Sequence, residues 1–174
     1  MVSKAFTKDD VWEDPVIPPR APLPAGVPNY VTRRGLALLR AELDALDADR
    51  QSLDANRSED VESRRRRAIV TARLSELAAR IGSAEVVDAN RQPHDTVRFG
   101  ARVMLRTVSG IGAGEERRLQ IVGVDEADAT HGRVAFIAPI ARAILGLEAG
   151  ETASLQTPRG EELLTVMSIE YPAD

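Results

Sequence analysis

The chain has no cysteine, only two lysines and only two histidines in its 174 residues. The absence of cysteine excludes disulfide bridges, a thiolate zinc site and a cysteine nucleophile. His94 and His131 are too few for a typical protein-built transition-metal site, and we interpret both as solvated loop residues. The six aromatic residues provide little material for a platform on which single-stranded nucleic acid could stack.

Long apolar runs are missing as well. No stretch approaches the length of a membrane span, and the first residues lack the apolar segment of a signal peptide. We therefore expect a cytoplasmic protein that does not contact membranes. The 23 basic and 27 acidic residues leave a net charge of −4, so the charge is informative only when it is examined region by region.

Residues 1–30 hold six of the ten prolines. Proline fixes φ and lacks a backbone donor, so this density predicts an extended N-terminal arm rather than a helix or a strand. The role of the arm stays open at this point. It is either a solvated tail or a segment whose Phe6 and Trp12 attach to a partner or to the body of the protein.

Apolar residues recur at alternating steps of three and four in the next segment, residues 31–88. This spacing is typical of helices that pack as a coiled coil, with Thr32 placed to cap the first helix and Gly82 to end the second. Two such rows around a polar break predict an antiparallel helical hairpin with its tip near residues 58–60. The same pairing places Arg50 opposite Arg67 as a polar layer. The rows are Leu36, Leu39, Leu43, Leu46, Arg50, Leu53 and Arg67, Val70, Leu74, Leu77, Ile81.

After a linker at residues 89–96, residues 97–174 alternate apolar and polar side chains with a period of two, which is typical of half-buried strands. Ile140–Leu145, which follows Pro139, is the only short helix expected there. The fold class is therefore α+β, a helical hairpin followed by a small antiparallel β domain. The expected strands are 97–105, 117–122, 134–137, 152–156 and 163–171.

The predicted hairpin tip separates its charges. Glu59, Asp60 and Glu62 gather at the tip, and the four arginines Arg64, Arg65, Arg66 and Arg67 follow on the second arm. Carboxylates at the end of a rod can complete a Mg²⁺ shell in another molecule, and arginines can hold a phosphate backbone. The alternative is purely structural, because acids favour a helix N-terminus and arginines form ion pairs along a helix.

The globular segment also carries several motifs in a fixed order. Phe99-Gly100-Ala101 comes first, then Gly123 with Asp125-Glu126-Ala127-Asp128, then Pro139-Ile140-Ala141-Arg142, then Thr157-Pro158 with Gly160-Glu161, then Ile169-Glu170-Tyr171. This order resembles the C-terminal domain of the Gre-type transcript-cleavage and elongation factors, GreA and GreB. Tyr30-Val31-Thr32 with Gly35 resembles the start of their coiled coil, and Ala84–Asp88 resembles its end. The sequence from Pro22 to Tyr30 resembles the corresponding segment of GreB-like chains.

The resemblance implies a coiled-coil hairpin joined to a domain of the FK506-binding-protein type, and it implies bacterial RNA polymerase as the partner of a monomeric factor. In that family the globular domain docks at the rim of the secondary channel, and the hairpin enters the channel. Glu59, Asp60 and Glu62 then correspond to tip carboxylates with a catalytic role on the Mg²⁺ of the polymerase, so the protein needs no cofactor or metal of its own and is not itself an enzyme. Arg64–Arg67 correspond to contacts with nascent RNA. The docking contacts correspond to Asp125, Glu126, Pro139, Ile140 and Ala141.

The tip departs from the family pattern, since its glycine, its Asn-Ala pair and its tyrosine are all missing. Ala138 also replaces the usual serine of the docking motif. We expect a hairpin about two heptads shorter than is usual in the family, which would retract the tip by about 10 Å. This leaves three functions open: a cleavage-stimulating factor, a non-cleaving competitor for the channel of the nucleoside diphosphate kinase regulator type, and an interaction module without a polymerase role. A prolyl isomerase is disfavoured, because Phe99, Phe136 and Tyr171 are more simply core residues.

Overall fold

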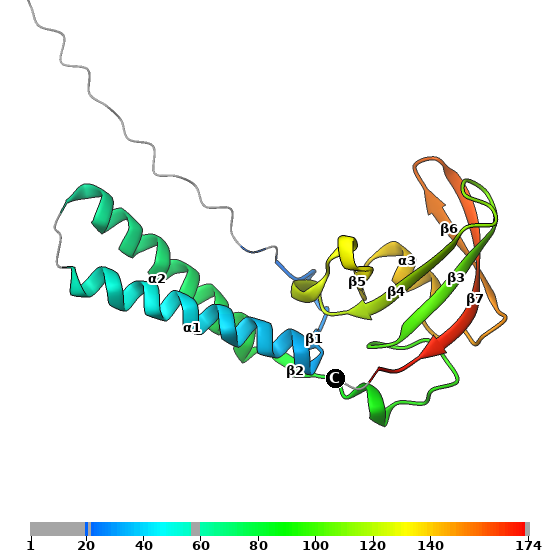
Figure 1. The fold of residues 1–174 in the computed structure, drawn as a ribbon, viewed down its shortest axis with the longest axis horizontal. Helices are drawn as coiled ribbons and strands as arrows, with labels where there is room; N and C mark the ends of the chain where they lie inside the picture. The colour runs from blue at the N-terminus through cyan, green and yellow to red at the C-terminus, as the bar shows by residue number, and fades with distance from the viewer. Residues whose placement is uncertain (1–19, 21, 57–59, 173–174) are drawn as a thin grey trace, which may run out of the picture.

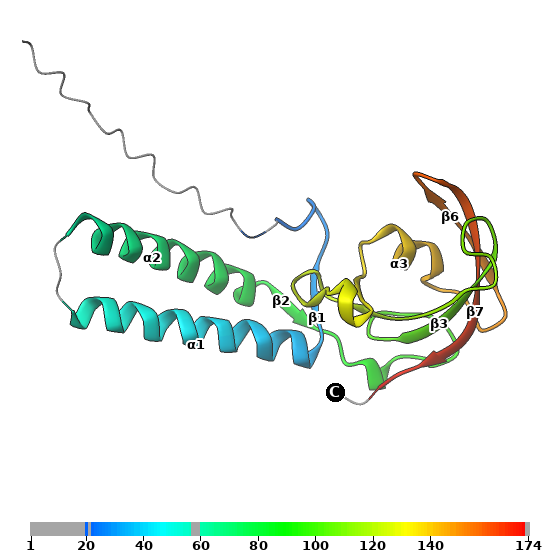
Figure 2. The same ribbon diagram turned by 45° about the horizontal axis from the view of Figure 1, so that its top comes forward.

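The computed structural model describes residue 20, residues 22–56 and residues 60–172. A helical hairpin projects from one end of a curled β domain (Figure 1). The helices are α1 (Arg33–Ala55) and α2 (Val61–Gly82), and they lie side by side in both views (Figure 2). The predicted α+β fold class is confirmed. No described helix is both long and apolar enough to cross a membrane.

Both hairpin helices begin at a side-chain cap. Thr32 Oγ1 accepts a hydrogen bond from the Gly35 amide at 2.8 Å, as the sequence predicted, and the Asp60 carboxylate accepts one from the Ser63 amide at 2.7 Å. Each cap satisfies an amide that has no partner in the first turn. At 23 residues, α1 is roughly 35 Å long, and this sets the reach of the hairpin.

Apolar packing is concentrated at the base of the hairpin. Leu39 of α1 and Leu77 of α2 are 2% and 1% exposed, and they pack with Val31. The predicted polar layer of Arg50 and Arg67 stays a prediction, but each arginine has the acceptor that such a layer requires. Arg50 is exposed and pairs with Asp47 at 2.7 Å, whereas Arg67 is half-buried and donates to the carbonyl of Leu53 at 3.2 Å. Each guanidinium group bonds to an acceptor on α1, and the two like charges thereby avoid each other.

A short parallel ladder closes the base of the hairpin. Strand β1 (Asn29–Val31) pairs with β2 (Ala84–Val86), and the buried amide of Asn29 donates to the carbonyl of Arg80 at 2.8 Å. Asn29 and Tyr30, which the sequence placed at the end of the arm, therefore belong to the hairpin base.

The β domain is a five-stranded sheet in the order β5-β4-β3-β7-β6. The prediction of a wholly antiparallel sheet is wrong at one edge, because β4 and β5 are parallel. Residues 123–132 lead the chain back along β4 through two 3-10 turns, so that β5 starts beside Gln120. The strands are β3 (Arg102–Ser109), β4 (Glu116–Val122), β5 (Arg133–Ala135), β6 (Thr152–Thr157) and β7 (Gly160–Glu170).

One face of this sheet is the core, and helix α3 (Pro139–Ile144) packs against it. Ala141 and Ile144 of α3 are buried together with the inward side chains of the strands. The strand predicted from Val97 begins only at Arg102, because Gly100 adopts φ +87° and the Ala101 amide donates back to the Arg98 carbonyl at 3.1 Å. The inward residues of that segment are nevertheless buried, namely Val97, Phe99 and Ala101.

Candidate functional site

The tip of the hairpin is the first candidate site. Glu59 lies outside the described residues. Asp60 is exposed, but its carboxylate bonds to the amide and the hydroxyl of Ser63 at 2.7 and 3.1 Å. Glu62 is exposed in the first turn of α2, where a negative charge interacts favourably with the helix dipole. Asp60 therefore serves as a helix cap, which is the structural role that the sequence left open.

The four arginines behind the tip differ in what they contact. Arg66 crosses to Asp49 of α1 at 2.9 Å, and Arg67 lies 3.7 Å from Asp54. Arg64 is exposed and Arg65 is half-buried. At least two of the four predicted RNA contacts therefore also tie α2 to α1.

Asp125 lies in the joint between the hairpin and the β domain. It sits in the 3-10 turn Val124–Glu126, and its side chain is 9% exposed. Arg20 donates to one of its oxygens at 2.7 Å, and Arg80 of α2 lies 3.3 Å from the other. Because three separate segments meet at this carboxylate, it fixes how they lie against one another.

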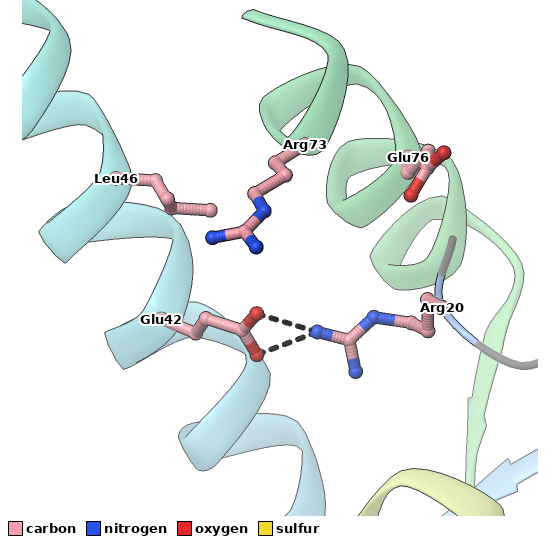
Figure 3. A pocket seen from close by; sticks show the side chains of 5 residues that line it. All are labelled: Arg20, Glu42, Leu46, Arg73 and Glu76. Atoms are coloured by element: carbon pink, nitrogen blue, oxygen red, sulfur yellow. Dashed lines mark hydrogen bonds and ion pairs between the residues drawn. The ribbon is translucent and has the colours of Figure 1, made fainter. Parts of the chain in front are cut away.

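Arg20 connects the N-terminal arm to both the hairpin and the β domain. Its guanidinium group also bonds to Glu42 of α1 at 2.6 Å, in a pocket that Arg73 and Glu76 help to line (Figure 3). Burial lowers the pKa of Arg20, but the hydrogen bonds to Asp125 and Glu42 outweigh that effect and raise it above its usual value. The group is therefore a permanent cation at this position.

Glu126 fastens the first turn of α1 to the β domain. It is 6% exposed, and it accepts hydrogen bonds from Thr32 Oγ1 at 2.5 Å and from Arg34 at 3.0 Å. A Cβ atom on Gly35 would lie 2.8 Å from a Glu126 oxygen, so only glycine permits this approach. Asp125 and Glu126, which the sequence predicts as docking residues, thus both bond to other residues of the chain and lie in the joint.

Three aromatic rings complete the joint. Tyr30 of β1 packs against Phe99 and Phe136 with ring centroids 5.9 and 5.6 Å apart. A Cβ atom on Gly123 would lie 2.6 Å from the Tyr30 carbonyl, which shows how closely the two bodies approach. Sequence reasoning missed Arg20, Tyr30 and Arg80 as joint residues. The one available signal was Arg20, the only cation between residues 9 and 32.

The remaining docking residues lie on α3. Pro139 is exposed, Ile140 is half-buried and Ala141 is fully buried in the core. Pro139 and Ile140 are thus accessible to a partner, whereas Ala141 supports them from below.

Asp128 organises the turn before β5. It accepts hydrogen bonds from the Thr130 hydroxyl, from His131 Nδ1 at 2.6 Å and from Arg133 at 3.0 Å. The bonds from Thr130 and His131 hold the pKa of Asp128 well below its usual range.

A lowered carboxyl pKa contributes stability above the pKa of the unfolded chain, about 3.9, and this contribution is lost as the pH falls toward the folded value. We therefore expect Asp128→Asn to destabilise the protein above about pH 5, and the deficit should shrink steadily as the pH falls below about 4. Urea unfolding at a series of pH values measures this. Asp44→Asn, on the exposed surface of α1, is the control and should give only a small difference in stability.

Within the described ranges, no three histidine or acidic side chains lie close enough together to hold a metal ion. The carboxylates that the structure places near the tip, Asp60 and Glu62, can at most contribute to a metal that another molecule holds.

Comparison with known proteins identifies relatives over most of the chain. Residues 92–171 match the family model "Transcription elongation factor, GreA/GreB, C-term". The GreA of Hyphomonas neptunium is 32% identical over 154 aligned residues, which cover 81% of this chain and 96% of the relative. The GreA of Francisella tularensis subsp. novicida is 32% identical, with 81% and 95% coverage.

Among solved structures, GreA factor homolog 1 of Thermus thermophilus is 22% identical, with a TM-score of 0.37 and coverage of 83% of this chain and 99% of that one. A GreA/GreB factor of Nitrosomonas europaea is 20% identical, with a TM-score of 0.40 and coverage of 83% and 99%.

Proposed function

The chain belongs to the GreA/GreB family of transcription elongation factors, and from this premise we propose that it binds bacterial RNA polymerase at the secondary channel and regulates elongation there. The β domain supplies the docking surface, with Pro139 and Ile140 at its accessible edge. The hairpin is the part that enters the channel. The protein acts on the polymerase in the cytoplasm, as a monomer, and holds no metal or cofactor of its own.

We further propose that it occupies the channel without stimulating RNA cleavage. The observation that carries this proposal is the state of the tip, where the described carboxylate nearest the turn, Asp60, caps α2 through Ser63. The reach of the hairpin supports the same view. The match to GreA spans 154 aligned positions, whereas 81% of 174 residues is about 141, so the relative has residues within the match that this chain lacks, and we propose that they lie in the hairpin.

The distance at which a carboxylate can act on a metal ion supports this mode. A carboxylate acts on a metal ion from about 2 Å, or through one water molecule. A hairpin shorter by about two heptads ends about 10 Å short of the position that a longer one reaches. Such a hairpin still obstructs the channel, and it would exclude a cleavage factor that enters by the same route.

Two measurements on purified polymerase test the proposal. We expect the full chain to bind core polymerase, to leave the cleavage rate of a backtracked complex unchanged, and to slow the cleavage that an added GreA stimulates. Acceleration of cleavage that disappears in the Glu59→Ala, Glu62→Ala double variant would instead assign the cleavage-stimulating role to the tip. Absence of binding would refute both polymerase functions and leave the interaction module.

A further inference from the structure

The outer face of the sheet carries a cationic cluster that the proposed function does not use. Arg102 of β3, Arg118 of β4 and Arg133 of β5 line one pocket of about 300 Å³, together with His131 and the side-chain amide of Gln120. We call these five residues the sheet arginine site. It lies on the β domain, apart from the hairpin and from α3.

The strand register explains why these side chains converge. Arg102 is paired with Gln120, which is paired in turn with Arg133, so the three form a row across three strands on one face. Arg118 stands in the neighbouring row, two residues before Gln120. The alternate residues of β3 and β4, such as Val103 and Leu119, turn to the core. Arg102 and Arg133 are two strand spacings apart, roughly 10 Å, which two arginine side chains bridge easily over Gln120.

The charges of this site are incompletely neutralised. Arg118 is exposed and Arg102 is half-buried, and neither side chain has a hydrogen bond or an ion pair among the described residues. Glu170 of β7 is paired with Arg102 in the ladder, but no ion pair joins their side chains, both of which the structure describes. Like charges on neighbouring strand positions repel, so an anion seated among them would relieve this repulsion.

Asp128, in the turn before β5, positions two residues of the site. Its carboxylate bonds to both His131 and Arg133, which holds these two residues in place and offsets part of their charge. Gly132 between them adopts φ +66° and lies so close to β4 that a Cβ atom would meet the Arg118 carbonyl at 2.9 Å. The turn is therefore packed against the strand, which fixes the position of His131 and Arg133 in the site.

We propose that the sheet arginine site binds a phosphate group, either of a free nucleotide or of an RNA backbone. The polar side chains that line it supply donors, with planar forks on three arginines and an amide on Gln120. These donors come from three neighbouring strands, and a phosphate has enough oxygens to accept from several arginines at once. The proposal is independent of whether the hairpin enters the polymerase channel.

Titration of the full chain with inorganic phosphate, a nucleoside triphosphate and a short oligouridylate tests this, with the side-chain amide signal of Gln120 in a ¹H–¹⁵N spectrum as the local reporter. We expect Arg118→Gln and Arg102→Gln each to weaken phosphate binding by about tenfold. Arg106→Gln is the matched control, because Arg106 lies on the same strand and face but is paired with Glu116 outside the pocket. It should leave the affinity unchanged.

Tighter binding of the triphosphate than of the oligouridylate would assign the site to free nucleotides, and the reverse order would assign it to RNA. Either order supports the proposal if Arg118→Gln weakens both ligands. An equal loss in Arg106→Gln would overturn it, since the effect would then be general surface charge. Tighter binding of polyglutamate than of any phosphate compound would also overturn it, in favour of an acidic protein segment. Arg118 is exposed, so its variant stays informative if Arg102→Gln fails to fold.

Discussion

Replacement of Asp125 with alanine is expected to lower the free energy of unfolding by about 3 kcal/mol, because it removes one partner of a buried ion pair. The side chains of Asp125 and Arg80 are only 9% and 8% exposed, and their charged groups lie 3.3 Å apart. The same change removes the bond from Arg20 at 2.7 Å, so the arm and α2 both lose their shared contact to the β domain. Urea unfolding followed by circular dichroism measures the loss.

Glu42→Ala is the matched control, since Glu42 binds the same Arg20 guanidinium group from an exposed position. An exposed ion pair contributes little, so this variant should lose less than about 1 kcal/mol. The double variant Arg80→Met, Asp125→Leu should recover most of the stability, because apolar residues of similar volume often replace a buried ion pair at little cost. A loss in Asp125→Ala no larger than in Glu42→Ala would show that the joint does not depend on this carboxylate.

The joint variant also has an expected functional effect. Asp125→Ala leaves the accessible residues of α3 unchanged, so binding to core polymerase through the β domain should persist. The direction of the hairpin would no longer be fixed, and competition with an added GreA should weaken. Equal loss of binding and competition would contradict the proposal that the β domain docks on the polymerase while the hairpin enters the channel.

Replacement of Leu77 with alanine is the second change with a large expected effect, a loss of about 2–5 kcal/mol. Leu77 is 1% exposed and packs with Leu39 and Val31 at the base of the hairpin. Its truncation leaves a cavity where α1, α2 and β1 meet. The helical signal in circular dichroism should then be lost at a lower urea concentration than in the parent chain.

Leu38→Ala is the control for this experiment, because Leu38 lies one residue from Leu39 but is 47% exposed. Its loss should remain within about 0.5 kcal/mol, as is usual for a surface substitution. Similar losses in the two variants would mean that helix propensity, rather than packing at the base, holds the hairpin together.

The sequence predicted the hairpin well because its signals are local. The spacing of Leu36, Leu39 and Leu43 defines one face of a helix, and Thr32 stands where the first turn needs a cap. The alternation from Val97 to Ala101 likewise predicted which side chains are buried. It misplaced the start of β3, because the positive φ of Gly100 makes a turn there, and alternation alone does not reveal it.

The candidate site was harder to predict, because sequence signals are local and several of its contacts join residues that are far apart in the chain. Asp60 and Ser63 are three residues apart, and the sequence already offered a structural role for the tip acids at a helix N-terminus as an alternative. The partners of Asp125 are 105 and 45 positions away, at Arg20 and Arg80, so no local pattern connects them. The docking role predicted for Asp125 and Glu126 rests on a motif and stays a prediction, whereas the structure shows both carboxylates bonded to residues of the arm or the hairpin.

The sequence by itself determined the class of the two bodies and the family, since periodicity, caps and ordered motifs are properties of neighbouring residues. It also determined what the chain lacks, from cysteine ligands to long apolar runs. Only the tertiary structure decided which charges are engaged within the chain. Burial and strand register bring distant residues together, so they turned Asp125 into the centre of a joint and aligned Arg102, Gln120 and Arg133 across three strands.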